Sequence, residues 1–246
     1  WKMLIEKGEE ITDMQIIDLF DSSKNRIEKF SIEFDNMFLD FSKNIINDET
    51  FELLLKLCED CELKKNIKSL FDGEKINETE NRSVLHTALR DFNLNSEIGK
   101  ELFSDRQKIK KFTNDILSGK TRGSTNKKIT DIVNVGIGGS DLGPNMVVES
   151  LKFYKTDLNC HFVSNVDGDH LQEVLKLVDP ETTLFIIVSK TFTTQETLTN
   201  AIKIKEFLVS RSIEDISRHF IGVTSNIKSA VEFGPVSYTH LTLPTI

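Results

Sequence analysis

Long apolar runs are missing from this sequence of 246 residues. No stretch approaches the ~20 consecutive apolar residues that a membrane-spanning helix needs, and the first residues lack the basic-then-apolar order of a secretory signal peptide. Cysteine is scarce, with three in the chain, so at least one is unpaired. These absences argue against a membrane protein and against a disulfide-stapled scaffold, and they predict a reducing, cytoplasmic setting.

Positive charge is also in deficit. The chain has 31 Lys and Arg against 39 Asp and Glu, which gives a net charge of −8. Nucleic acids and anionic membranes attract proteins through an excess of positive charge, so neither is an expected partner of the chain as a whole. An anionic ligand would have to be bound by a local site.

The N-terminal part is predicted to be mainly helical. Thr12 and Gln15 have the spacing of a capping-box pair ahead of an apolar stretch, so a short helix is expected to begin there. Apolar residues that alternate with polar ones predict a small hairpin over 30–41. Longer amphipathic patterns predict helices over 47–63 and 104–118.

The character of the sequence changes after a polar Gly/Ser/Thr/Asn stretch at 123–128, which is typical of a loop. Four short runs rich in Val, Ile and Phe follow, with helical patterns between them, at 132–135, 160–166, 183–188 and 219–223. This alternation indicates consecutive β-α-β units. The predicted fold class is therefore α/β, with a parallel sheet covered by helices on both faces.

The last twelve residues, PVSYTHLTLPTI, depart from this composition. They hold two of the four prolines and one of the two tyrosines, and they contain no Asp, Glu, Lys or Arg. One interpretation is a flexible terminus. We favour another, in which natural coding ends near Gly234 and residues 235–246 are foreign, such as a cloning or assembly scar.

A glycine-rich turn, GIGGSDLGP over 136–144, follows the first apolar run. Such a turn presents main-chain N–H groups to an anion at a helix N-terminus, and Pro144 is expected in the first helical turn. Two nucleotide-binding motifs fail here, because Asp141 stands where a dinucleotide fingerprint needs glycine and Pro144 stands where a P-loop needs lysine. The turn predicts an anion cradle in which Ser140 supplies a hydroxyl; a tight turn without a ligand is the alternative.

A second polar turn, SKTFTTQET over 189–197, follows the third apolar run. Its hydroxyls can donate to a phosphate, and Lys190 adds a positive charge. Ligands of open parallel sheets bind beyond the carboxyl ends of the strands, so this turn and 136–144 are expected at the same edge. The alternative is that Thr194 caps a helix, which would account for one threonine of the cluster.

Metal and thiol chemistry find little support in the spacing of the residues. Cys58 and Cys61 have CxxC spacing, but they lack a second pair and lie in a helical pattern, so structural cysteines are expected. The five histidines are dispersed, and His86 and His219 are expected to pack or to hydrogen-bond. Neither a metal nor a cofactor is predicted.

Four segments resemble the phosphoglucose isomerase family, in sequence and in their order. They are ENRSVLHTALR (80–90), VGIGGSDLGP (135–144), FVSNVDGDH (162–170) and SKTFTTQET (189–197). Asp169 departs from the threonine that the family more often has at this position. The resemblance extends over nearly the whole chain up to Gly234.

The resemblance implies a sugar-isomerase (SIS) domain, a flavodoxin-like α/β sandwich, preceded by a mainly helical segment with a small hairpin. We therefore expect the helical segment over 1–104, a first and truncated SIS domain over 105–234, and the tail over 235–246. The implied activity is the reversible interconversion of glucose 6-phosphate and fructose 6-phosphate in glycolysis and gluconeogenesis. The implied full-length protein is a cytoplasmic homodimer without a cofactor.

The motif positions of the family imply roles for six residues of this chain. Two would border the substrate and four would lie around its phosphate, respectively Gly139 and Ser140, and Ser189, Lys190, Thr191 and Thr194.

The catalytic groups of the family are not matched. In the family a glutamate shuttles a proton, a histidine opens the sugar ring, an arginine in a G-G-R-[YF]-S segment stabilises the enediolate, and a lysine lies near the C-terminus. None has a counterpart here, and His240 in the tail is not proposed as one. We expect the chain to keep the phosphate-binding part and to show no isomerisation alone. The alternative is a non-catalytic SIS module that binds or senses a phosphosugar.

Overall fold

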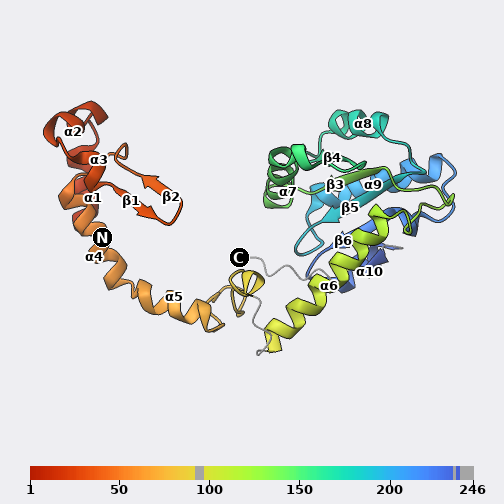
Figure 1. The fold of residues 1–246 in the computed structure, drawn as a ribbon, viewed down its shortest axis with the longest axis horizontal. Coiled ribbons are helices and arrows are strands. Elements are labelled where there is room, and N and C mark those ends of the chain that lie inside the picture. The colour runs from red at the N-terminus through yellow and green to blue at the C-terminus, as the bar shows by residue number, and fades with distance from the viewer. Residues whose placement is uncertain (92–96, 235–236, 239–246) are drawn as a thin grey trace. The chain divides into compact units, whose positions relative to one another are not determined.

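The computed structural model describes residues 1–91, 97–234 and 237–238 (Figure 1). Its contacts divide the chain into two compact units, Trp1–Ser83 and the part from Val84 onward, which are described separately. Among the helices of the described residues, none combines the length and the apolar composition needed to cross a membrane. The domain boundaries expected at 104 and 234 stay predictions.

The first unit is helical apart from one hairpin. Its elements are α1 (Lys2–Ile11), α2 (Ile16–Ser22), α3 (Arg26–Lys29), β1 (Ser31–Phe34), β2 (Met37–Asp40), α4 (Asp48–Asp60) and α5 (Leu63–Phe71). The predicted hairpin is confirmed, because β1 and β2 pair antiparallel with Ser31 opposite Asp40. Asp35 forms its tight turn with a φ of +49°.

A buried arginine organises the core of the first unit. The Arg26 side chain is 2% exposed and donates hydrogen bonds of 2.7, 2.9 and 2.9 Å to the main-chain carbonyls of Ser42, Asn44 and Ile46. Its guanidinium also lies 4.7 Å from the centre of the Phe30 ring. One side chain thus ties the residues after the hairpin to α3.

Two local predictions for this unit are wrong. The helix α2 exists, but its capping box is formed by Gln15 and Asp18, and the Thr12 hydroxyl instead donates to a carbonyl one turn back at the end of α1. The helix predicted over 47–63 stops early, because Glu62 adopts a φ of +50° and a new helix, α5, starts after it.

The second unit is an α/β sandwich. Its elements are η1 (Ala88–Arg90), α6 (Glu97–Leu117), β3 (Asp131–Val135), α7 (Gly139–Ser150), η2 (Lys152–Tyr154), β4 (Asn159–Val163), α8 (Gly168–Leu177), β5 (Thr183–Val188), α9 (Gln195–Ser210), η3 (Ile216–His219), β6 (Phe220–Val223), α10 (Ile227–Phe233) and β7 (Ser237–Tyr238). The four predicted strands are confirmed, although β4 ends at Val163 rather than at 166. The helix predicted over 104–118 is α6, which begins at Glu97.

The sheet of this unit is parallel, with the spatial order β4-β3-β5-β6-β7. In chain order this is 2-1-3-4-5, the order of flavodoxin-like doubly wound folds. After β3 the chain adds β4 on one side and then β5 on the other side. The order in which strands are added therefore reverses between β3 and β5, where Val135 lies beside Ile187. The predicted fold class is confirmed, and ligands of such sheets bind at this topological switch point.

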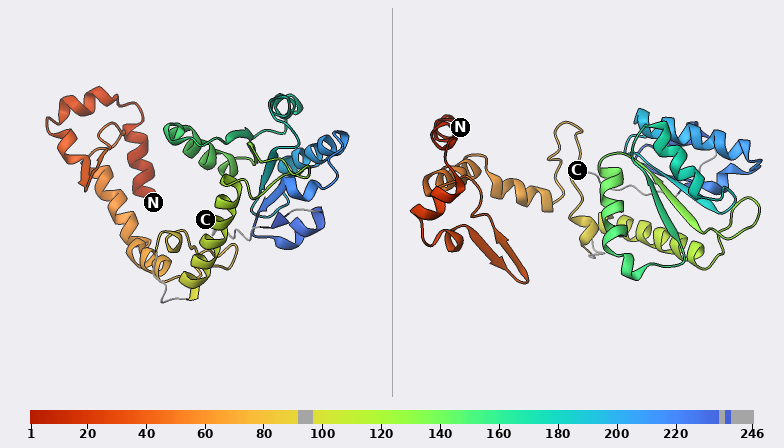
Figure 2. Two further views of the ribbon diagram at one scale, coloured as in Figure 1. Left: turned by 45° about the vertical axis from the view of Figure 1, so that its right-hand side comes forward. Right: turned by 90° about the horizontal axis from the view of Figure 1, so that it is seen from above.

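Helices cover both faces of the sheet (Figure 2), and alternate residues of the strands pack against the two layers. Val133 and Phe185 pack in a core with α8 and α9, whereas Ile132 and Leu184 pack in a second core with α6. Burial on both faces explains why the strands read as continuous apolar runs. A fully buried side chain of this size contributes about 1.5–3 kcal/mol relative to exposure, so the sheet holds the unit together.

His219 fastens the polar loop 123–128 to the sheet. Its Nδ1 donates to the Thr183 carbonyl at 2.7 Å, and its Nε2 accepts from the Ser124 N–H at 2.9 Å. An added Cβ on Gly123 would lie 2.8 Å from the imidazole and 2.3 Å from a neighbouring carbonyl oxygen, so only glycine fits this close approach. The expectation that His219 hydrogen-bonds is confirmed.

A polar cluster surrounds Asp131 at the start of β3. Its carboxylate accepts hydrogen bonds from His161 Nε2 at 2.9 Å, from the Thr130 hydroxyl at 2.7 Å and from the Asn159 amide at 3.3 Å. Burial raises the pKa of Asp131, but the three hydrogen bonds outweigh it, so the pKa lies below its usual value. This cluster is at the amino end of the strand and therefore at the edge opposite the predicted anion site.

Candidate anion-binding site

Two glycines shape the turn after β3. Gly138 has a φ of +61° and immediately precedes α7. At Gly136 an added Cβ would lie 2.8 Å from the Cβ of Ser140 and 2.9 Å from its carbonyl oxygen, so a side chain there would displace the first turn of α7. Gly139 and Ser140 are the first two residues of that helix.

The hydroxyl of Ser140 is one donor that this turn offers to an anion. The Ser140 N–H donates to the Ile137 carbonyl at 3.2 Å, and the next N–H along donates to the Gly138 carbonyl at 3.0 Å. Both of these N–H groups are thus engaged inside the turn, so the turn has fewer N–H groups available for an anion than the sequence predicts. The Ser140 side chain is half-buried at the carboxyl end of β3.

Pro144 lies deeper in the helix than expected. Because α7 begins at Gly139, Pro144 is in its second turn, and the placement in the first turn is wrong. A proline there has no N–H to donate to the carbonyl of Ser140, four residues earlier. The buried Asn134 of β3 supplies the substitute, since its Nδ2 donates to that carbonyl at 3.0 Å. The side chain of the strand therefore fixes the helix start.

The turn after β5 groups hydroxyls in pairs. Ser189 is 2% exposed, and its Oγ lies 3.0 Å from Oγ1 of Thr194. The exposed hydroxyls of Thr191 and Thr193 lie 2.7 Å apart. The half-buried Lys190 belongs to the same turn. Hydroxyls paired in this way can reorient their hydrogens toward an incoming oxyanion.

A buried aromatic ring anchors the turn 189–197 after β5, which we call the hydroxyl turn. Phe192 has a φ of +53°, which is unusual for a bulky residue. Its ring is 2% exposed and packs against the ring of Phe233, with centroids 5.7 Å apart. This packing helps to hold the strained backbone of Phe192 in place, and the neighbouring Thr191 and Thr193 are exposed.

Thr194 stands at the N-cap of α9 but does not cap it with its side chain. Its side chain accepts no hydrogen bond from the first turn of this helix, and its hydroxyl lies 3.0 Å from that of Ser189 instead. The N–H groups at the start of a helix favour an anion. The geometry supports a hydroxyl cluster more than simple helix capping.

All six predicted site residues lie at one edge of the sheet. Gly139 and Ser140 follow β3, and the four residues of the second turn follow β5. These two strands are hydrogen-bonded neighbours and run parallel, so both turns leave the same edge. That edge is at the topological switch point of the sheet. The structure brings the two turns together as the sequence predicts; the ligand roles of their residues stay predictions.

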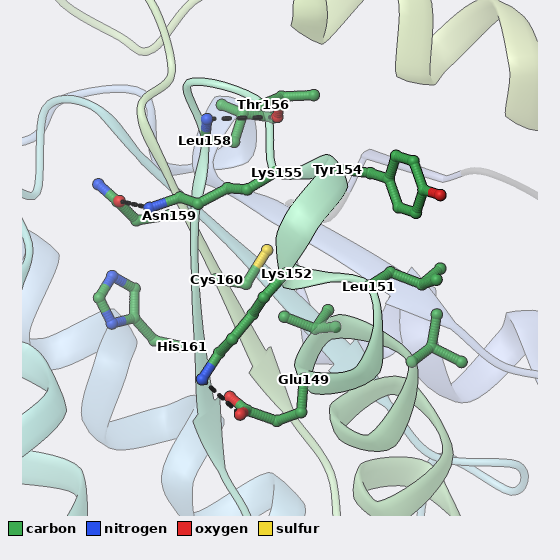
Figure 3. Close-up of a pocket in the computed structure, with 12 residues that line it drawn as sticks. Glu149, Leu151, Lys152, Tyr154, Lys155, Thr156, Leu158, Asn159, Cys160 and His161 are labelled. Carbon is green, nitrogen blue, oxygen red and sulfur yellow. Dashed lines mark hydrogen bonds and ion pairs between the residues drawn. The ribbon is translucent and has the colours of Figure 1, made fainter.

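A cavity of about 460 Å³ lies elsewhere, between the end of α7, η2 and the edge strand β4 (Figure 3). The six predicted residues are not among the residues that line it. Cys160 is one of its lining residues, and burial raises the pKa of this thiol, which disfavours a reactive thiolate. In the described part of the chain, no three His, Cys, Asp or Glu side chains are placed to hold a metal ion.

Comparison with known proteins settles the family. A model described as phosphoglucose isomerase matches residues 40–241. The chain belongs to this family. It is 50% identical over 241 residues to a glucose-6-phosphate isomerase of Christiangramia forsetii and 48% identical over 243 residues to one of Wigglesworthia glossinidia brevipalpis.

This phosphoglucose isomerase family member spans less than half the length of the curated relatives it matches. Both alignments cover 95% of this chain and 44% of the relative. A crystal structure of a glucose-6-phosphate isomerase from Chlamydia trachomatis is similar to 87% of this chain and 45% of that chain, with a TM-score of 0.66 and 27% identity. More than half of the length of each of these relatives has no counterpart in the chain.

Two supports of the site in this family member escaped the sequence analysis. One is Asn134, whose amide holds the start of α7. A polar residue inside the otherwise apolar run of β3 was the available signal, because a buried amide needs a partner. The other is the segment 224–226 after β6, which donates hydrogen bonds to the carbonyls of Lys190 and Thr191. His240 lies outside the described residues.

Proposed function

We propose that this chain is the phosphate-binding part of a glucose-6-phosphate isomerase, which interconverts glucose 6-phosphate and fructose 6-phosphate. Ser189, Lys190, Thr191 and Thr194 hold the phosphate, and Gly139 and Ser140 border the sugar. The observation that carries this proposal is the pair of turns after the neighbouring parallel strands β3 and β5, at the switch point of the sheet. The full-length enzyme is proposed to be a cytoplasmic homodimer in glycolysis and gluconeogenesis, without a cofactor.

The chemistry of the second turn suits a sugar phosphate. A phosphate group presents three oxygens that accept hydrogen bonds, and the turn offers a run of hydroxyls, an ammonium group and the start of α9. The first turn adds the Ser140 hydroxyl one strand away. In the proposed arrangement the phosphate lies over β5 and the sugar extends toward β3.

Isomerisation needs groups that this site does not supply. A base must move a proton between two carbons, and a cation must stabilise the enediolate that forms between the two steps. The resemblance assigns these roles to segments beyond the part of the family that the chain covers. We therefore propose that the chain alone binds substrate and does not turn it over.

The test is a titration with inorganic phosphate and with fructose 6-phosphate by calorimetry, together with a coupled isomerase assay. Lys190→Ala is expected to weaken phosphate binding about tenfold, because it removes a charge-assisted contact. Lys108→Ala is the matched control, since Lys108 is an exposed lysine of α6 paired with Asp105. Turnover by the chain that Lys190→Ala abolishes would overturn the proposal that it is inactive; equal phosphate affinity of both variants would overturn the site.

A second candidate is a non-catalytic module that senses a phosphosugar. It is favoured by one observation, the self-contained core that α8 and α9 form with the sheet. A sensor is expected to bind fructose 6-phosphate much more tightly than inorganic phosphate, because selectivity requires contacts with the sugar. The part of a divided enzyme is expected to bind the two with similar, weak affinity.

A further inference from the structure

The segment Thr224–Asn226, directly after β6, forms hydrogen bonds with the main chain of the hydroxyl turn. The carbonyl of Lys190 accepts three hydrogen bonds from it: from the Ser225 N–H at 3.0 Å, from the Ser225 hydroxyl at 2.7 Å and from the Thr224 hydroxyl at 3.0 Å. The Asn226 amide donates to the carbonyl of Thr191 at 3.0 Å.

These contacts connect two consecutive carbonyls of the turn to a neighbouring strand. The Ser189 N–H donates to the Val223 carbonyl at 3.1 Å, so the ladder between β5 and β6 runs on into this contact. The segment is itself braced, because the Asn226 N–H donates to the Thr224 hydroxyl at 3.0 Å. The turn is therefore held from the side opposite β3.

We propose that Asn226 and Ser225 are positioning residues of the phosphate site. They bind the carbonyls of Lys190 and Thr191, so that these carbonyls point away from the ligand. The turn therefore has its ligand-binding conformation before the ligand binds. The inference rests on the proposed function and deepens it. A loop fixed in its bound conformation loses less conformational freedom on binding, which raises affinity.

Asn226 also has a purely structural role that the test must separate. Its Oδ1 accepts from the Ser229 N–H at 3.1 Å and thereby caps α10. Serine is a good N-cap residue, but its hydroxyl is too short to reach the carbonyl of Thr191 as well. Asn226→Ser therefore retains the cap and removes the contact with the turn. Ser225→Ala, which keeps the main-chain bond and removes one side-chain donor, is the second variant.

The matched control is Asn47→Ser in the first unit. Asn47 caps α4 in the same way, with its Oδ1 accepting from the Thr50 N–H at 2.9 Å. Any general cost of replacing a capping Asn with Ser is measured there, away from the phosphate site.

The experiment measures the affinity for inorganic phosphate and the amide hydrogen exchange of peptides covering 189–194 and 223–226 in the full chain. We expect Asn226→Ser to weaken phosphate binding about tenfold and to speed exchange in both peptides, Ser225→Ala to do so to a smaller extent, and Asn47→Ser to change neither. Unchanged affinity and exchange in Asn226→Ser would overturn the inference.

The two proposals fail in distinguishable ways. If the unaltered chain binds no phosphate, the proposed function fails. Exchange without ligand then decides the inference about positioning: faster exchange at 189–194 in Asn226→Ser supports it, and equal exchange refutes it.

Discussion

At the start of α7 the side chain of Asn134 replaces the missing N–H of Pro144 as hydrogen-bond donor, and this replacement can be measured as a coupling free energy between the two residues. Pro144 cannot donate to the Ser140 carbonyl, and Asn134, which is 8% exposed, donates in its place at 3.0 Å. Asn134→Ala removes that donor and leaves a poorly solvated carbonyl, at a cost of about 1–3 kcal/mol. Pro144→Ala restores a main-chain N–H at the position from which an α-helix donates to the same carbonyl.

The double variant is therefore expected to be less unstable than the sum of the two single variants predicts. One recovered hydrogen bond corresponds to a coupling of about 1 kcal/mol in favour of the pair. Changes in backbone freedom caused by losing proline enter both Pro144→Ala proteins equally and cancel in the cycle.

The assay must report on the second unit. The single tryptophan of the chain, Trp1, lies in the first unit, so its fluorescence would follow the wrong part. Native-state hydrogen exchange of peptides covering β3 and β5 is suitable, and a loss of 2 kcal/mol would speed exchange about 30-fold. Strict additivity of the two substitutions would refute the idea that Asn134 substitutes for the missing N–H.

Three further predictions concern Gly136, Arg26 and Asp131. Gly136→Ala should destabilise the second unit by about 1–3 kcal/mol, because its Cβ would overlap Ser140; slower or equal exchange of β3 would contradict this. Arg26→Ala should lower the stability of the first unit by about 3 kcal/mol, seen as faster native-state hydrogen exchange of peptides covering α3 and 41–46, because three carbonyls lose a charged donor. The pKa of Asp131 is depressed, so its contribution to stability is present above the unfolded pKa of about 3.9 and is lost as the pH falls through the lower folded value. Asp131→Asn should therefore remove part of the loss of stability below about pH 4, whereas an unchanged pH profile would show that the cluster contributes nothing.

The strands of the sheet were predictable because their physics is local. A strand buried on both faces must be apolar at nearly every position, so runs such as 183–188 identify themselves. The hairpin was predictable for a related reason, since its alternation and turn residues lie within twelve consecutive positions of the chain, 30–41. The common position of the two predicted anion-binding turns followed from the strands, because parallel strands place their carboxyl ends at one edge.

Helix boundaries were less predictable because several residues compete for each cap. Thr12 and Gln15 both offer a side chain, and the choice of Gln15 depends on the position of Asp18 and on where α1 ends. The early stop of α4 depends on a φ of +50° at Glu62, a residue type that gives no sign of it. Such choices are decided by differences of about 1 kcal/mol that packing easily overrides.

The placement of Pro144 shows a different kind of miss. Proline is best tolerated in the first turn, so its local preference pointed to a later helix start. Two tertiary features let the helix start earlier. Gly136 allows the helix to approach the end of β3, and the side-chain amide of Asn134 donates the hydrogen bond that Pro144 cannot donate. Neither is visible from proline alone, although a polar residue in the middle of an apolar strand is a usable sign.

One requirement connects these features. A site for an anion needs donors at its surface, and every main-chain carbonyl nearby is a potential repulsive partner unless another group engages it. In the first turn the carbonyls of Ile137 and Gly138 accept from N–H groups of the turn itself, and that of Ser140 accepts from Asn134.

The second turn meets the same requirement with donors from another strand. The Ser189 carbonyl accepts from the Phe192 N–H at 3.3 Å, and the carbonyls of Lys190 and Thr191 accept from the segment 224–226. Six carbonyls around the two turns are thus engaged by N–H, amide or hydroxyl donors, while the hydroxyls of Thr191 and Thr193 stay exposed. The main-chain hydrogen bonding therefore favours an anion over a cation at this edge, independently of the charge on Lys190.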